Sequence, residues 1–136
     1  MIFSKPALSG SDHRPIITIG EVEDIMKDTG SITGWHAHIY FDAESKPAAR
    51  ALGEAAVAKF GIAMGHMHDG PVGPHPVASC QLSVTPELFG EIIPWLALNR
   101  GDLTVFAHAE SGDHLADHTH HVLWLGTSLP LDLSIF

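Results

Sequence analysis

The segment GWHAHIYF, residues 34–41, alternates between two kinds of side chain. In an extended strand, successive side chains point to opposite faces. One face is then apolar, with Trp35, Ala37, Ile39 and Phe41. The other face carries His36, His38 and Tyr40. The apolar face predicts a core. The histidine face is either a binding site or the solvated side of a half-buried sheet, and this segment alone leaves both interpretations open.

The rest of the chain extends this pattern. Segments 62–68, 78–84 and 102–109 predict further strands, and a strand with an apolar tail is expected within 121–136. Segments 45–61 and 85–101 predict helices, with Ser45 and Thr85 as N-caps and Gly61 and Gly101 as stops. This order predicts an α+β ferredoxin-like sandwich, in which two helices cover one face of a mainly antiparallel sheet that has an extra C-terminal strand.

One domain boundary follows from the same pattern. Residues 1–33 are expected to form an N-terminal arm, with a possible short strand in PIITIGEVEDI (15–25), and residues 34–136 to form the domain. If the helices cover the face that includes Ile39, Leu82 and Val105, the opposite face is expected to be open. That face would receive His36, His38, Tyr40, Ser79, Gln81, Ser83, Thr104, Phe106 and His108.

Composition excludes several classes of protein. The 136 residues carry a net charge of −9, which disfavours binding to nucleic acid or to anionic membranes. The single cysteine, Cys80, lies in a strand-like segment and is expected to be buried and unreactive. We find neither a signal peptide nor a membrane span in the sequence, so a cytoplasmic location is expected.

Histidine is the unusual residue type, with eleven copies where a chain of this length typically has about three. Ten of them lie in the ranges 36–38, 66–75 and 108–121. Imidazole binds iron, zinc, copper and nickel, and a strand can present two rings to one ion. The candidate metal ligands are His36, His38, His75 and His108. Taken singly, His75 and His108 could equally be structural, and His66 and His68 are expected to be exposed.

The remaining candidates concern catalysis and substrate. His118 lies in a polar segment from which it could reach a bound substrate as an acid or base, oriented by Asp117 or Asp113. Tyr40, Gln81 and Phe106 share the histidine face and are candidates for substrate contact. Arg100 could bind a substrate carboxylate, although a helix end attracts a cation for structural reasons alone.

Four motifs together resemble one known family. They are WHAHIYF, GPVGPHP, PWLALNRGDLTVFAHAESGD and DHTHHVLWLGTSLPLDL. From about residue 33 to the end, the chain is similar to the small DOPA 4,5-dioxygenase-like proteins of bacteria and fungi. Where the family usually has proline after the histidine of AHAESGD, this chain has Ala109. The recurring histidines of the family fall on His36, His38, His75, His108 and His118.

The resemblance implies a non-haem iron(II) extradiol dioxygenase, although another divalent metal is possible. Its substrates would be O2 and a small aromatic diol, a catechol such as DOPA or caffeate. No carboxylate ligand can be identified from the sequence, so an all-histidine site is possible. A homodimer is expected, because such a sheet leaves edges and a face to cover. The alternatives are a non-enzymatic domain of the same fold that binds a metal or an aromatic ligand, and a structural dimerisation module with surface histidines.

Overall fold

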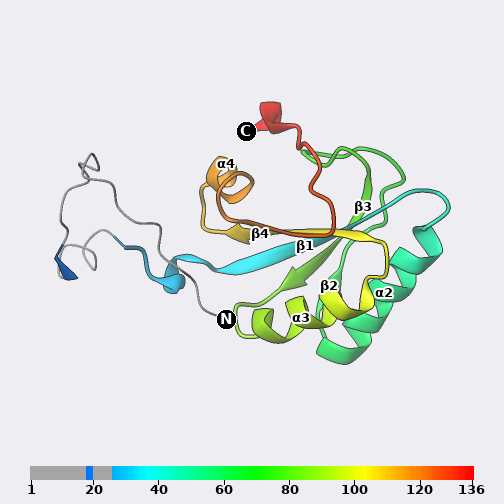
Figure 1. Cartoon of the computed structure of the whole chain (residues 1–136), viewed down its shortest axis with the longest axis horizontal. Coiled ribbons are helices and arrows are strands. Elements are labelled where there is room, and N and C mark those ends of the chain that lie inside the picture. Colours follow the sequence, from blue (N-terminus) through cyan, green and yellow to red (C-terminus); the bar gives the residue numbers. More distant parts are fainter. Residues whose placement is uncertain (1–17, 20–25) are drawn as a thin grey trace, which may run out of the picture.

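A computed structural model describes residues 18–19 and 26–136 of the chain (Figure 1). Most of the expected arm, including nearly all of the possible strand at 15–25, lies outside the described residues. The boundary between residues 33 and 34 stays a prediction. None of the helices in the described part is long and apolar enough to cross a membrane.

The described residues form one five-stranded sheet in the order β2-β3-β1-β4-β5. Every pair of neighbouring strands is antiparallel. The strands are β1 (Gly34–Phe41), β2 (Ala63–Met64), β3 (Ala78–Val84), β4 (Thr104–Glu110) and β5 (Val122–Leu125). Helix α2 (Lys46–Phe60) connects β1 to β2, and α3 (Phe89–Asn99) connects β3 to β4. Both helices lie on the same side of the sheet (Figure 1). This topology confirms the predicted ferredoxin-like sandwich with an added C-terminal strand.

The helix boundaries differ in part from those expected. Gly61 ends α2 in the left-handed conformation, as predicted. Ser45, however, makes no side-chain capping bond, because its hydroxyl instead donates to the carboxylate of Asp42. Helix α3 begins at Phe89, later than expected. The Thr85 hydroxyl still accepts from the Leu88 N–H, and so caps the turn that leads into α3.

The expected strand at 62–68 is interrupted. Its first part, β2, pairs Met64 with Leu82, and pairing resumes where His68 forms a bridge with Ser79. The four residue steps from Met64 to His68 therefore lie opposite only three steps, from Leu82 to Ser79. One extra residue on one strand is the geometry of a β-bulge. The bulge leaves His66 and His68 exposed, as expected.

The face of the sheet under α2 and α3 is apolar. Ala37, Ile39, Leu82 and Val105 are fully buried there, against residues such as Leu52 of α2 and Ile92 and Leu96 of α3. Cys80 belongs to the same cluster and is buried, as predicted. Burial raises the pKa of its thiol to about 11, so the thiolate is disfavoured at neutral pH.

The opposite face is covered, which corrects the expectation of an open face. Its cover consists of α4 (His114–Asp117), the loop before β3, and the chain from β5 to the short helix η2 (Leu133–Ile135), which lie on the far side of the sheet from α2 and α3 (Figure 1). The Asp132 N–H donates to the Pro74 carbonyl, and the ring of Phe136 lies 4.4 Å from that of His118. The histidines therefore line a partly covered cavity instead of a fully solvated surface.

Candidate metal centre

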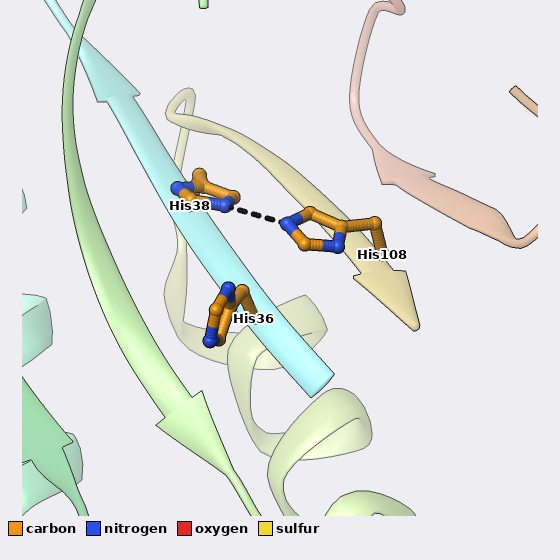
Figure 2. A group of neighbouring side chains, drawn as sticks. All are labelled: His36, His38 and His108. Atoms are coloured by element: carbon orange, nitrogen blue, oxygen red, sulfur yellow. Dashed lines mark hydrogen bonds between the residues drawn. The ribbon is translucent and has the colours of Figure 1, made fainter. Parts of the chain in front are cut away.

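Three histidines from the two central strands converge on the covered face. The antiparallel register places His36 opposite His108 and His38 opposite Phe106, so all four side chains lie on one face. One ring nitrogen from each of the three histidines can be chosen so that these nitrogens all lie within 4.8 Å of one another. Figure 2 shows the three rings grouped across β1 and β4. The structure thus brings together three of the four predicted ligands.

The positions of the ring nitrogens suit a divalent transition metal. Nε2 of His38 and Nε2 of His108 are 3.1 Å apart. Two imidazoles that bind one ion at about 2.1 Å and at right angles hold their nitrogens about 3 Å apart. The Nδ1 of His108 lies 3.0 Å from the Ala109 carbonyl and donates to it, so the lone pair of His108 is on Nε2. That lone pair accepts a hydrogen bond from Nε2 of His38 in the metal-free protein and would be available to an ion in its place.

His75 approaches the group from the loop before β3. It is buried, and its ring lies 4.0 Å from the ring of His38. Its Nδ1 forms a 2.8 Å hydrogen bond with the Tyr40 hydroxyl, which fixes the ring. Burial raises the pKa of Tyr40, so the hydroxyl stays protonated. His75 lies outside the convergent group of three, and its role as a ligand stays a prediction.

Burial keeps these imidazoles neutral. It lowers the pKa of His75 and of His108 to about 4 and holds the pKa of His38 well below its usual range, and repulsion between neighbouring histidines adds to each shift. Burial also lowers the pKa of His36, an effect that the nearby Glu110 carboxylate opposes. A neutral imidazole is the form that binds a metal, so no proton has to leave these rings at neutral pH.

His118 follows the short helix α4 and lies above His108, with 4.0 Å between the ring centroids. Its Nδ1 contacts the His114 carbonyl at 2.7 Å, so the Nε2 of the neutral ring carries the free lone pair. Asp113 and Asp117 do not orient this ring, contrary to one expectation. Asp113 accepts from the Ala116 N–H and caps α4.

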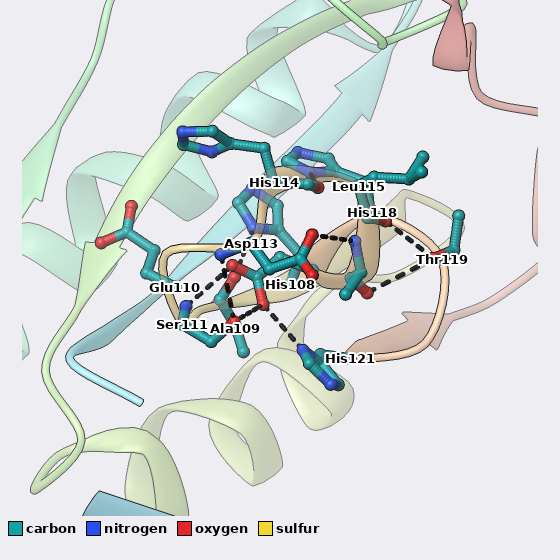
Figure 3. A network of polar contacts seen from close by, with 12 residues as sticks. His108, Ala109, Glu110, Ser111, Asp113, His114, Leu115, His118, Thr119 and His121 are labelled. Carbon is teal, nitrogen blue, oxygen red and sulfur yellow. Dashed lines mark hydrogen bonds and ion pairs between the residues drawn. The ribbon is translucent and has the colours of Figure 1, made fainter. Parts of the chain in front are cut away.

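Asp117 anchors the segment that carries His118. Figure 3 shows the network of polar contacts in this segment, with Ser111 and His121 among the labelled residues. Its buried carboxylate accepts hydrogen bonds from the N–H and the hydroxyl of Ser111, and contacts Nδ1 of His121 at 2.7 Å. Burial alone would raise the pKa of Asp117, but these hydrogen bonds outweigh that effect and lower it. The carboxylate therefore ties α4 to Ser111 at the end of β4. This contact holds in place the segment between β4 and His118.

A cavity of about 470 Å³ adjoins the histidines. Its walls include His36, His38, His75, His108, His118, Gln81, Glu110 and Phe136. Its size lies within the usual range for small-molecule sites. Tyr40 and Phe106 do not line the cavity but pack behind its histidines, with Phe106 fully buried.

Arg100 lies elsewhere. It lines a separate, larger hollow of about 720 Å³ that has no histidine in its walls, and its guanidinium donates to the Leu103 carbonyl. We assign the chemistry to the smaller cavity because the titratable groups converge there.

Glu110 and Phe136 are among the residues of the cavity wall that were missed from the sequence. Glu110 stands two positions after His108 on β4, and strand alternation could have placed it on the histidine face. The ring of Phe136 lies 4.4 Å from that of His118. No pattern in the sequence places this distant residue there.

The fold and the site define an α+β protein with a buried histidine cluster at the centre of its sheet. The family model of the Dopa 4,5-dioxygenase family matches residues 35–135, and the chain belongs to this family.

Relatives and a solved structure agree with this assignment. The chain is 31% identical over 142 residues to the DOPA 4,5-dioxygenase of Amanita muscaria, covering 98% of this chain and 62% of that protein. It is 37% identical over 120 residues to an uncharacterized 21.2 kDa protein of Botryotinia fuckeliana, covering 79% of this chain and 66% of that protein. The chain thus spans just under two thirds of these curated relatives. A crystal structure of a candidate dioxygenase from Nostoc punctiforme is similar, with a TM-score of 0.77, 42% identity, and 79% and 94% of the two chains covered.

Proposed function

We propose that the chain is a non-haem iron(II)-dependent extradiol dioxygenase that opens the ring of a catechol resembling DOPA or caffeate. The observation that carries this proposal is the group of three imidazoles in the cavity wall, in a chain that belongs to a dioxygenase family. In extradiol cleavage, the bond between a hydroxylated ring carbon and its unhydroxylated neighbour breaks. Both atoms of O2 enter the product, so no external reductant is needed.

His36, His38 and His108 would hold the metal. When bound, iron(II) supplies coordination positions for a chelating catechol and redox chemistry for O2. Because the three ligands come from one face of the sheet, the cavity side of the ion would be left for substrates. Three neutral imidazoles leave the charge of the ion uncompensated, which favours a catechol that has lost its protons.

His118 is the proposed acid–base residue. Its Nδ1 is engaged by the His114 carbonyl, so Nε2 would accept a proton from a catechol hydroxyl and return it to the opening ring. Phe136 packs on the other side of this imidazole and lines the cavity, where it would help to exclude water. Gln81, which pairs with His38 across β1 and β3 and lines the cavity, would offer an amide to the substrate. A homodimer and a cytoplasmic location stay predictions.

Anaerobic reconstitution tests the proposal. We expect one Fe(II) per chain and, on adding O2, oxygen uptake with one catechol of a panel and absorbance of a yellow ring-opened product. Protein loaded with Zn(II), which has no redox chemistry, should show neither signal. Stoichiometric metal and catechol binding without oxygen uptake would favour the non-enzymatic binding domain, and the absence of any bound metal would favour the structural module.

A further inference from the structure

Glu110 supplies a carboxylate at the histidine site that the sequence did not reveal. It is the last residue of β4 and lies opposite Gly34, two positions beyond the pair formed by His36 and His108. Side chains two positions apart share a face, so the carboxylate and the three rings are on the same side of the sheet. The carboxylate is in contact with Nε2 of His36.

The backbone of Glu110 is held in place. Its carbonyl accepts hydrogen bonds from both the N–H and the hydroxyl of Thr33, at 2.9 and 3.1 Å. The end of β4 is therefore tied to the residue that precedes β1. Glu110 and Thr33 both line the cavity beside His36. The backbone that carries the carboxylate is thus fixed at the cavity wall.

The contact decides which nitrogen of His36 is available. Because the carboxylate occupies Nε2, the nitrogen that remains free is Nδ1. Figure 2 shows one ring nitrogen of His36 on the side of His38 and His108 and the other on the far side. His36 therefore differs from His38 and His108, whose Nε2 atoms face one another.

We propose that Glu110 is a positioning residue that holds the Nε2–H of His36 and so presents the Nδ1 lone pair to the metal. The inference rests on the proposed function for the ion itself. A carboxylate that accepts the second N–H of a metal-bound imidazole fixes the tautomer and the ring orientation and makes the ligand more basic. Glu110 acts on the ion through His36 and is not one of the three groups that converge on it.

A double-mutant cycle on Zn(II) affinity, measured by chelator competition, tests this role without turnover. Glu110→Gln should weaken binding by about 10- to 100-fold, the usual cost of losing such a partner. Glu87→Gln removes the same charge from an exposed turn and should leave the affinity unchanged. In a His36→Ala background, where the weaker residual Zn(II) affinity is measured by direct titration at higher Zn(II) concentration, Glu110→Gln should cause no further loss, because the two side chains act as one unit. An equal further loss in that background would overturn the proposal and indicate a direct ligand or a long-range charge effect.

A second measurement uses the metal-free protein. Long-range 1H–15N NMR should find the neutral His36 ring protonated on Nε2 in the wild type, and this preference should be lost in Glu110→Gln. A ring protonated on Nδ1 in the wild type would also overturn the proposal. Suppose that the Zn(II) affinity cycle and the NMR both give the expected results, but that no catechol of the panel causes oxygen uptake. The proposed activity then fails, and the role of Glu110 stands. A wild-type chain that binds no divalent ion would overturn both.

Discussion

The two faces of the sheet both carry buried side chains but differ in chemistry. On the face under the helices, Ile39 and Leu82 are fully buried among other apolar side chains. On the other face, His38 and His108 are each only 5% exposed, and burial lowers the pKa of both. Burial stabilises the first set and costs free energy for the second. One face therefore supports the fold, whereas the composition of the other indicates a functional site.

Replacing a ligand on the histidine face should have the largest effect. His38→Ala should abolish both stoichiometric metal binding and ring cleavage, because a water in place of the imidazole is a poor substitute in a group of three. Metal analysis and oxygen uptake measure both losses. His66→Ala removes an exposed histidine and serves as the control. A His38→Ala protein that keeps its metal would end the assignment of His38 as a ligand.

The buried imidazoles should make the metal-free protein sensitive to acid. The pKa of His75 and of His108 is about 4 in the folded protein, below the ordinary value of 6.5 that applies in the unfolded chain. Below pH 6.5 the unfolded state therefore binds more protons, so the free energy of unfolding should fall as the pH drops from about 6.5 to about 4. Each such imidazole contributes about 1.4 kcal/mol per pH unit within that window.

Urea unfolding across this pH range measures the effect. In His75→Gln, the pH dependence should be less steep by the contribution of one imidazole. A free energy of unfolding that does not change between pH 6.5 and 4 would mean that these rings are protonated in the folded state.

Ile39→Ala probes the opposite face at the next residue of the same strand. The truncation leaves a cavity under the helices and should lower the free energy of unfolding by about 2–5 kcal/mol. Chemical denaturation measures this loss, and metal analysis should still find one ion per chain under folding conditions. Loss of the ion in a protein that remains folded would show that the two faces are not independent.

His118→Ala should separate proton transfer from metal binding. The ring lies beside His108 but outside the convergent group, so metal and catechol binding should persist while turnover falls by roughly a hundredfold or more. Steady-state kinetics and metal analysis test this, with exposed His120→Ala as the control from the same segment. Loss of metal equal to that in His38→Ala would make His118 a ligand.

The smallest effect is expected at Cys80, on the helix-covered face. Cys80→Ala should cost roughly 1 kcal/mol of stability and leave the metal affinity unchanged, because the buried thiol packs as a small apolar group. Thermal unfolding and chelator competition measure the two quantities. A weakened affinity would bring the sulfur into the site.

The helix-covered face could be predicted because it depends on local pattern. Alternation placed Ile39, Cys80 and Leu82 in the core, and the succession of strands and helices gave the topology. The cover of the second face could not be predicted in this way. It depends on contacts made by irregular segments, such as Phe136 with His118 and the Asp132 N–H with the Pro74 carbonyl. Polar and irregular segments carry no periodicity that indicates where they pack.

The candidate site also contains residues that local pattern predicted and residues that it did not. Strand alternation predicted that His36, His38 and His108 share a face, and the structure brings them together. Arg100 was considered from its residue type alone, and the structure places it at another hollow. Glu110 was missed because its neighbour His108 ended the expected run of site residues, although both follow the same alternation.

The central position of β1 has a consequence for how the site opens. Because β1 is paired along its length with both β3 and β4, its amide protons should exchange with deuterium only when the whole domain unfolds. The amides of η2 and of the turns around α4 lie in short elements at the surface, and should exchange through local opening. The strand that carries His36 and His38 would therefore stay rigid while the segments that carry His118 and Phe136 open and close above it. The path by which an ion or a substrate enters should run through those segments.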